Sequence, residues 1–179
     1  METAFAKSST APTPHRWVTW KMPPLDWIAL NVDGSSLGNP GNAGFGGLLR
    51  DSNGAWISGF LGAIGITNNL HAELMGLLHG LQLTWENGYR KFICYSDSMD
   101  ALSLINRFLP VHHHYSPVVL SIQDLLQRDW EVVLKHTLRE GNFCADLLAK
   151  MGANSSSNLT IIHVAPPGIS PLLLADAMV

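Results

Sequence analysis

Hydrophobic and polar residues alternate along the first patterned segment of the chain, residues 25–33. Ile28, Leu30 and Val32 share one side of this alternation, which has the period of a β-strand, and Asp33 ends the segment on the other side. A cluster of turn residues follows. Two further strand-like segments are separated by a loop containing Asn53-Gly54, a strong hairpin signal. We therefore expect three hairpin-linked strands at residues 25–33, 43–50 and 55–63.

A helical period replaces the alternation after residue 69, and Asn87-Gly88 is a typical helix stop. Further along, Ser116-Pro117 and Asn142 are cap-like starts of helices. One face of the first helix is formed by Leu74, Leu77, Leu78, Leu81 and Trp85. The expected elements are a helix at residues 69–86, a strand at 91–96, a helix from 98 to 108, a helix at 116–128, a strand at 130–137 and a helix at 142–152.

Three hairpin-linked strands followed by strand–helix crossovers predict an α/β fold. Its centre would be a mixed five-stranded sheet, with three antiparallel strands and then two parallel ones. We expect residues 25–152 to form this domain. Residues 1–24 show no periodic pattern and are interpreted as a leader or linker, most simply a disordered one. Residues 153–179 are interpreted as a linker and an apolar tail that either packs on the domain or meets a partner.

The composition limits the class of protein. Of the 179 residues, 46% are hydrophobic and 14% are charged, which is typical of a globular domain. No apolar run reaches the roughly 18–20 residues of a membrane span. The cysteines, Cys94 and Cys144, lack metal-ligand spacing, which favours a reducing intracellular compartment such as the nucleus or cytoplasm. The Ser, Thr and Pro content of the leader leaves organelle targeting open as an alternative.

Four acidic residues stand where one predicted element gives way to the next. Asp33 and Asp97 end strands, whereas Glu73 and Asp146 lie near the starts of helices. Ligand sites in such sheets form where strands end and helices begin, so we expect the four carboxylates to share one site. Carboxylate oxygens hold hard divalent cations, and two cations about 3.5–4 Å apart can serve phosphodiester hydrolysis. The pattern therefore favours a metal-dependent nuclease.

The residues around these acids resemble a known family, the type 1 ribonuclease H of cells, retroviruses and retroelements. The resemblance covers roughly residues 25–152, with the family's motifs in order. Residues 136–142 and the Pro-Pro pair before the first strand are similar to the branch found in plant non-LTR retroelements. The motifs are Asp33-Gly34-Ser35-Ser36-Leu37-Gly38-Asn39-Pro40-Gly41, Gly44-Phe45-Gly46-Gly47, Thr67-Asn68-Asn69, Ala72-Glu73-Leu74, Ser96-Asp97-Ser98 and Ala145-Asp146-Leu147-Leu148-Ala149.

This resemblance implies a ribonuclease H-like fold, with helices on both faces of the sheet, and an enzyme that cuts the RNA strand of RNA–DNA hybrids. It implies two Mg²⁺ ions, or Mn²⁺, held by Asp33, Glu73, Asp97 and Asp146, and a mobile catalytic histidine at His136. An expected partner besides nucleic acid is a reverse transcriptase or another protein, fused or separate, and no membrane is expected. The nucleic-acid contacts of the family correspond to Gly34, Ser35, Ser36, Asn39, Asn69 and Asn142.

Other features favour a second interpretation. The net charge is −3, the basic helical protrusion of some family members is missing, and Met99 stands where many members have a glutamine. The alternative is a retroelement-derived domain with little or no activity that binds nucleic acid or a protein. A 3′–5′ exonuclease or an integrase of the same broad fold is disfavoured by the turn at residues 38–41 and the hairpin.

Overall fold

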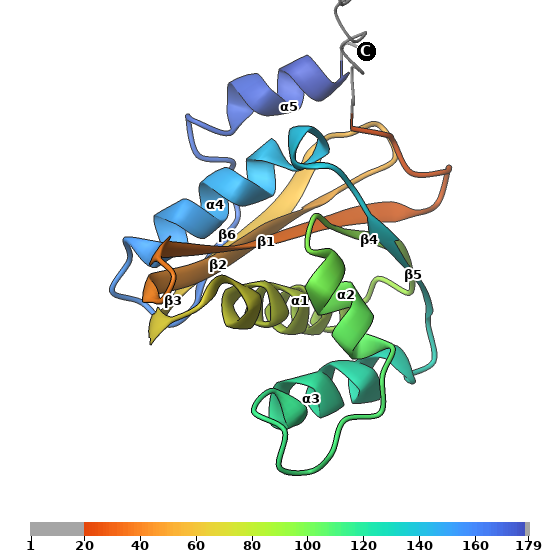
Figure 1. The fold of residues 1–179 in the computed structure, drawn as a ribbon. Coiled ribbons are helices and arrows are strands. Elements are labelled where there is room, and N and C mark those ends of the chain that lie inside the picture. The colour runs from red at the N-terminus through yellow and green to blue at the C-terminus, as the bar shows by residue number, and fades with distance from the viewer. Residues whose placement is uncertain (1–19, 178–179) are drawn as a thin grey trace, which may run out of the picture.

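A computed structural model describes residues 20–177 (Figure 1). The strands are β1 (Ile28–Gly38), β2 (Gly41–Arg50), β3 (Trp56–Thr67), β4 (Lys91–Ser96), β5 (Glu131–His136) and β6 (Thr160–Ile162). They form one mixed sheet with the order β5-β4-β1-β2-β3-β6. The hairpin pairs β1–β2 and β2–β3 are antiparallel, as is β3–β6, whereas β1–β4 and β4–β5 are parallel. The predicted α/β fold on a mixed sheet is confirmed.

Helices cover both faces of this sheet, as the resemblance implies (Figure 1). The helices are α1 (Asn69–Glu86), α2 (Met99–Ile105), α3 (Ser116–Leu126), α4 (Phe143–Ala153) and α5 (Ser170–Ala177). The first three enclose the larger hydrophobic core with one face of the sheet, and α4 and α5 enclose a smaller core on the other. Within residues 20–177, none of the helices combines the length and the apolar character needed to cross a membrane.

The first strand is longer than the sequence predicts, and this changes the position of Asp33. β1 continues to Gly38 and stays paired with β2 along this length, so Asp33 lies inside the strand and not at its end. The predicted turn cluster is reduced to the link at Asn39 and Pro40. Turn-type residues remain extended here because β2 supplies a continuous hydrogen-bonding partner, and pairing overrides local preference.

Small residues let α1 approach β1 closely. A Cβ atom at Gly34 would lie 2.3 Å from the main chain of Ala72 and Glu73, and one at Gly76 would lie 2.8 Å from the carbonyl oxygen of Asp33. These distances are too short for any larger side chain, so glycine is needed at both positions. The close contact brings the start of α1 onto the strand that carries Asp33.

The described part of the C-terminal tail packs on the domain. β6 extends the sheet beyond β3, and Ile169 is fully buried as part of the smaller core. The guanidinium of Arg50, only 1% exposed, forms an ion pair of 2.7 Å with Asp176 in α5. The predicted sheet was one strand short because β6 has three residues, too few for an alternating pattern to be recognised.

The segment before β1 is also part of the packed domain. Trp20 is 6% exposed, and its ring lies 3.8 Å from the Arg50 guanidinium carbon. Residues 20–24, expected to end a leader, therefore contain a core residue. The expectation of a disordered leader at residues 1–19 lies outside the described residues.

Helix ends differ in detail from those predicted. Ser98 caps α2, since its hydroxyl accepts a hydrogen bond of 3.2 Å from the Ala101 N–H, but α2 ends at Ile105 and not at residue 108. Ser116 is the first residue of α3, and Tyr115 occupies the N-cap without a side-chain bond. The predicted Ser116 cap is therefore wrong. Ser116 is already inside the helix, one position past the N-cap, and is 2% exposed.

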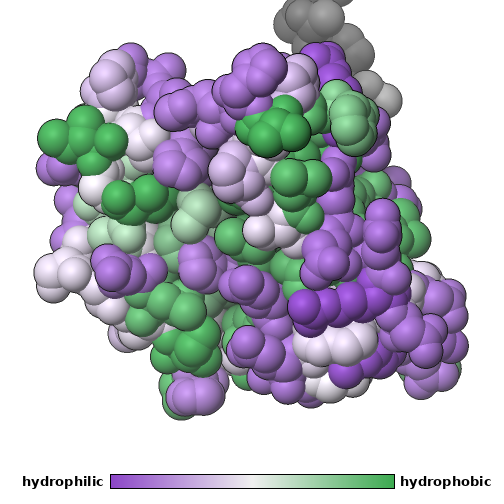
Figure 2. Space-filling view, turned by 90° about the horizontal axis from the view of Figure 1, so that it is seen from below, coloured by the Kyte–Doolittle hydropathy of each residue, from purple (hydrophilic) through white to green (hydrophobic). Residues whose placement is uncertain are grey.

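The link between α2 and α3 contains no helix among the described residues, as the missing basic protrusion predicts. Figure 2 shows the face of the molecule on which α3 lies, with hydrophobic and hydrophilic side chains interspersed. Phe108 and Val111 in the link and Leu120 in α3 are exposed.

Candidate active site

Three carboxylates meet beside the C-terminal end of β4. Asp33, Glu73 and Asp97 each offer an oxygen, and these oxygens all lie within 4.8 Å of one another. Parallel pairing aligns Asn31 with Tyr95, so the same register continued past β4 sets Asp33 beside Asp97. The sheet thus delivers two of the acids.

The third acid, Glu73, comes from α1. It was expected near the start of the helix, but the first turn contains no acidic residue and Glu73 lies in the second. The cap of α1 is Asn68, whose side-chain oxygen accepts a hydrogen bond of 2.9 Å from the His71 N–H. Glu73 is therefore held at the site by the packing of α1 against Gly34, and the dipole contributes less because its effect falls off beyond the first turn.

Among residues 20–177, none of the three clustered acids forms an ion pair. Asp33 is 3% and Glu73 is 9% exposed, and burial raises the pKa of both carboxyls far above the ordinary range. The neighbouring carboxylates Asp97 and Asp146 raise both pKa values further. One buried oxygen of Glu73, Oε2, has no hydrogen-bond partner among the described residues. An unpaired buried acceptor beside two more carboxylates fits a divalent cation, which prefers oxygen ligands and would neutralise the charge.

Asp146 stands beside this group and not within it. It lies in the first turn of α4, as predicted, and its carboxylate is 17% exposed. Its Oδ2 forms an ion pair of 2.9 Å with Lys150 Nζ, one helical turn further on. The sequence analysis did not identify this partner, although the spacing of four residues between an acid and a lysine in a helix is a signal for it.

His136 lies at the rim of the cluster. It is the last residue of β5 and is exposed, and its Nε2 is 3.3 Å from the carbonyl oxygen of Asp97. The imidazole is therefore next to the acids and open to solvent at the same time.

Most residues expected to contact nucleic acid line one surface next to the acids. Gly34, Ser35 and Ser36 follow Asp33 in β1 and are half-buried. Asn39 and Asn69 are exposed and adjacent, since the Asn39 side-chain oxygen accepts a hydrogen bond of 3.1 Å from the Asn69 N–H. The hairpin end and the start of α1 thus form a continuous surface that leads to the cluster.

Asn142 does not belong to that surface. It is 2% exposed, with its amide oxygen accepting from Asn31 Nδ2 at 3.0 Å and its amide nitrogen donating to the Val32 carbonyl at 2.9 Å. As the N-cap residue of α4 it also makes no side-chain capping bond, contrary to prediction. In this structure the amide is bonded to β1 and not to the first turn of α4.

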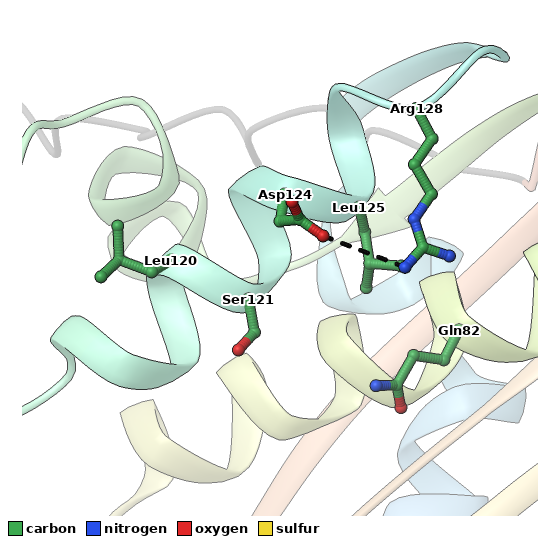
Figure 3. Close-up of a pocket in the computed structure, with 6 residues that line it drawn as sticks. All are labelled: Gln82, Leu120, Ser121, Asp124, Leu125 and Arg128. Carbon is green, nitrogen blue, oxygen red and sulfur yellow. Dashed lines mark ion pairs between the residues drawn. The ribbon is translucent and has the colours of Figure 1, made fainter.

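A separate pocket of about 400 Å³ lies between α1 and α3 (Figure 3). Asp124 and Arg128 form an ion pair of 3.9 Å on its wall, and Gln82 lines its α1 side. At 1.5 Å per residue, Gln82 is about 13 Å further along α1 than Glu73. This pocket is therefore not part of the carboxylate site.

Comparisons with known proteins agree with this geometry. The family model described as reverse transcriptase-like matches residues 31–152. The chain is 35% identical over 169 residues to "Putative ribonuclease H protein" of Arabidopsis thaliana, covering 94% of this chain but only 27% of that protein, so the chain spans about a quarter of its length. It is 32% identical to the ribonuclease H of Blochmanniella floridana, covering 73% of this chain and 86% of that enzyme.

Solved structures share the fold. The N-terminal RNase H domain of a Mycobacterium tuberculosis protein has a TM-score of 0.65 and 25% identity, over 72% of this chain and 94% of that one. LC11-RNase H1, solved in complex with an RNA/DNA hybrid, has a TM-score of 0.61 and 24% identity, over 71% and 96% of the two chains. From the sheet order, the acidic cluster and these matches, the chain belongs to the reverse transcriptase-like family of ribonuclease H-type domains.

Proposed function

We propose that this protein is a metal-dependent endonuclease that hydrolyses the RNA strand of RNA–DNA hybrids. The observation that carries the proposal is the convergence of Asp33, Glu73 and Asp97, with a buried Glu73 oxygen that lacks a protein partner. Relatives named ribonuclease H, and a similar fold solved with an RNA/DNA hybrid, support this substrate class.

Asp33, Glu73 and Asp97 would hold two divalent cations, Mg²⁺ or Mn²⁺, and Asp146 would be a fourth ligand when it turns away from Lys150. When bound there, the cations supply Lewis acidity at the scissile phosphate and offset the negative charge that develops during hydrolysis. Asp33 is the most buried of the three converging acids, and it would serve as a ligand to both ions.

The surrounding residues have separate tasks in this proposal. His136, exposed beside Asp97, moves protons between the site and solvent and assists product release. The exposed amides of Asn39 and Asn69, with the β1 segment from Gly34 to Ser36, contact the sugar–phosphate backbone. The 2′-hydroxyl, present on only one strand, makes RNA the strand that is cut. Because these contacts address the backbone and not the bases, sequence preference is expected to be slight.

The test is cleavage of an end-labelled RNA–DNA hybrid by the full chain in Mg²⁺, with Asp97→Asn as the decisive variant. Loss of an outer partner of a metal ligand costs 10–100-fold, so we expect loss of a ligand to cost more than about 100-fold. Asp100→Asn is the matched control, because Asp100 is exposed three residues further along the chain. A wild-type rate equal to that of Asp97→Asn would refute the proposal.

The competing proposal, a binding module with little activity, draws support from the Asp146–Lys150 ion pair, which engages the fourth acid at 2.9 Å. Fluorescence anisotropy with a labelled hybrid separates the two proposals. A module binds equally well with Mg²⁺ and with EDTA and shows no turnover. An enzyme of the proposed kind cleaves in Mg²⁺, and cleavage stops in EDTA. Lys150→Ala provides a further distinction, because this change removes the ion-pair partner of Asp146. Cleavage increases in Lys150→Ala only if the ion pair suppresses activity in the wild-type protein.

A further inference from the structure

A chain of buried hydrogen bonds runs from the segment before β1 to the start of α4. The indole N–H of Trp20 donates to Asn31 Oδ1 at 3.1 Å, and Asn31 Nδ2 donates to Asn142 Oδ1 at 3.0 Å. Asn142 Nδ2 then donates to the carbonyl oxygen of Val32 at 2.9 Å. Trp20, Asn31 and Asn142 are 6%, 2% and 2% exposed, so water does not compete for these bonds. We call these three residues the relay.

The relay connects two elements that carry acids of the candidate active site, β1 with Asp33 and α4 with Asp146. Asn31 precedes Asp33 by two residues and shares its face of β1, and the Val32 carbonyl that receives the last bond immediately precedes Asp33. Main-chain bonding continues from the same residue, because the Asn142 carbonyl accepts the Asp146 N–H at 3.0 Å. One side chain therefore connects the strand of Asp33 to the helical turn of Asp146.

Stability alone gives little reason for this arrangement. An asparagine at an N-cap contributes about 0.5–2 kcal/mol when its side chain binds the first helical N–H groups. Asn142 makes no such bond, and its side-chain amide is hydrogen-bonded to β1 instead. Two well-packed apolar residues in place of a buried amide pair are often neutral or stabilising. What the amide pair adds is a fixed distance and orientation between β1 and α4.

The start of the relay is itself held in place. The Trp20 ring lies 3.8 Å from the guanidinium carbon of Arg50, and Arg50 is paired with Asp176 of α5. Trp20 stands before the segment matched by the family model, which begins at residue 31. A residue outside the matched segment is thus connected by hydrogen bonds to the strand of Asp33 and to the first turn of α4.

We propose that Trp20, Asn31 and Asn142 are positioning residues that set the place of Asp146 relative to Asp33. This rests on the proposed function in one respect, that Asp146 serves as a ligand of the divalent cation. The relay acts on Asp146 through α4 and touches neither substrate nor cation. We therefore expect the relay to set the affinity for the cation through the position of Asp146. The cleavage rate of the metal-saturated protein depends on the relay much less.

The test uses the full chain with two relay variants and two controls. Trp20→Phe removes one N–H and keeps an aromatic ring over Arg50, whereas Asn142→Ala removes both links to β1. Trp56→Phe and Asn154→Ala are the matched controls, because the Trp56 indole and the Asn154 amide each donate one exposed bond to a main-chain carbonyl. All five proteins are compared by calorimetric titration with Mg²⁺ alone.

The expected results follow from the role of partners that orient a ligand. The Mg²⁺ dissociation constant rises about 10–100-fold in Asn142→Ala and at least about threefold in Trp20→Phe, while both controls stay within about twofold of wild type. The Mg²⁺ concentration for half-maximal cleavage rises in parallel, and the rate at saturating Mg²⁺ falls far less. In the double variant, the two effects combine to less than their product, because both act through one chain of bonds. A full product overturns the relay as a unit.

Amide hydrogen exchange at Asp146, measured without metal, separates failure of this inference from failure of the proposed function. A relay that holds the first turn of α4 predicts at least about tenfold faster exchange there in Asn142→Ala than in Asn154→Ala. Equal exchange and equal Mg²⁺ affinity overturn the inference, whether or not wild type cuts hybrids. If Asn142→Ala does not fold, Trp20→Phe decides alone. If exchange is faster in Asn142→Ala and the wild-type protein cuts no hybrid, the relay is supported and the proposed function is refuted.

Discussion

Replacing Asp33 by asparagine is expected to stabilise the metal-free protein while it abolishes activity. Asp33 is 3% exposed, and burial, with Glu73 close by, raises its pKa from an ordinary value of 3.8. Keeping such a carboxyl protonated at pH 8 costs up to roughly 5–6 kcal/mol, at about 1.36 kcal/mol per pH unit. Water entry and relaxation reduce this, so we expect a gain of about 1–4 kcal/mol for Asp33→Asn, since polarised surroundings screen buried charges.

The raised pKa values determine how the stability of the metal-free protein changes with pH. The folded-state pKa values of Asp33 and Glu73 lie above their unfolded values of 3.8 and 4.5, so their protonation favours folding at low pH. That contribution is lost as the pH rises through the folded-state values. Metal-free wild type therefore loses stability from about pH 4 upward, and the advantage of Asp33→Asn grows between pH 5 and pH 8. Mg²⁺ reverses the order by stabilising wild type through binding.

Thermal denaturation with EDTA or with Mg²⁺, at pH 5 and pH 8, measures these differences. For a chain of this size, 1 kcal/mol corresponds to roughly 2–4 °C in Tm, so Asp33→Asn should melt about 2–16 °C above wild type at pH 8 in EDTA. Asp129→Asn, at an exposed aspartate, is the control and should not move Tm. Equal Tm values for Asp33→Asn and wild type at pH 8 in EDTA would refute the reasoning, as would a gap that widens toward pH 5.

Three further outcomes are expected. Asp176→Ala leaves Arg50 buried without its partner and should cost about 2–4 kcal/mol in urea denaturation, whereas Asp124→Ala, in an ion pair that is largely exposed, should cost less than about 1 kcal/mol; similar costs would contradict this. Gly34→Ala places a Cβ 2.3 Å from the main chain of α1 and should lower stability by about 2 kcal/mol or more, together with Mg²⁺ affinity, as seen by calorimetry. His136→Ala should lower the cleavage rate about 10–1,000-fold and change the unfolding free energy by less than about 0.5 kcal/mol, because the side chain is exposed; an unchanged rate removes His136 from the mechanism.

Periodicity was sufficient to predict the order of the elements through residue 153, because each of those strands and helices repeats its pattern long enough to be recognised. The hairpin at Asn53-Gly54 is an example, since Gly54 adopts a φ of +80° that the Asn-Gly signal anticipates. Where periodicity failed, a partner elsewhere in the sheet decided the structure. β1 runs on through turn-type residues because β2 pairs with it, and β6 forms because β3 offers an edge.

The site was predictable to the extent that its residues carry local signatures. Asp97 follows a buried strand and Asp146 opens a helix, and both contexts are visible in the sequence. The bond between Asn31 and Asn142 joins residues 111 positions apart, and no local pattern connects them. Asn31 stands on the polar side of the predicted alternation in the first strand, where an exposed side chain is the ordinary expectation, so the pattern gives no sign of its buried partner.

The segment that carries the motifs is shorter than the segment that folds. The family model matches residues 31–152, yet Arg50 inside that segment is 1% exposed and depends on Trp20 and Asp176 outside it. A buried guanidinium without its counter-charge costs several kcal/mol, a large share of the 5–15 kcal/mol that stabilises a typical domain. The motifs mark the residues around the acids, and these lie in only a few strands and helices. The buried core depends on the whole sheet, so the residues needed for folding extend beyond the motifs at both ends of the matched segment.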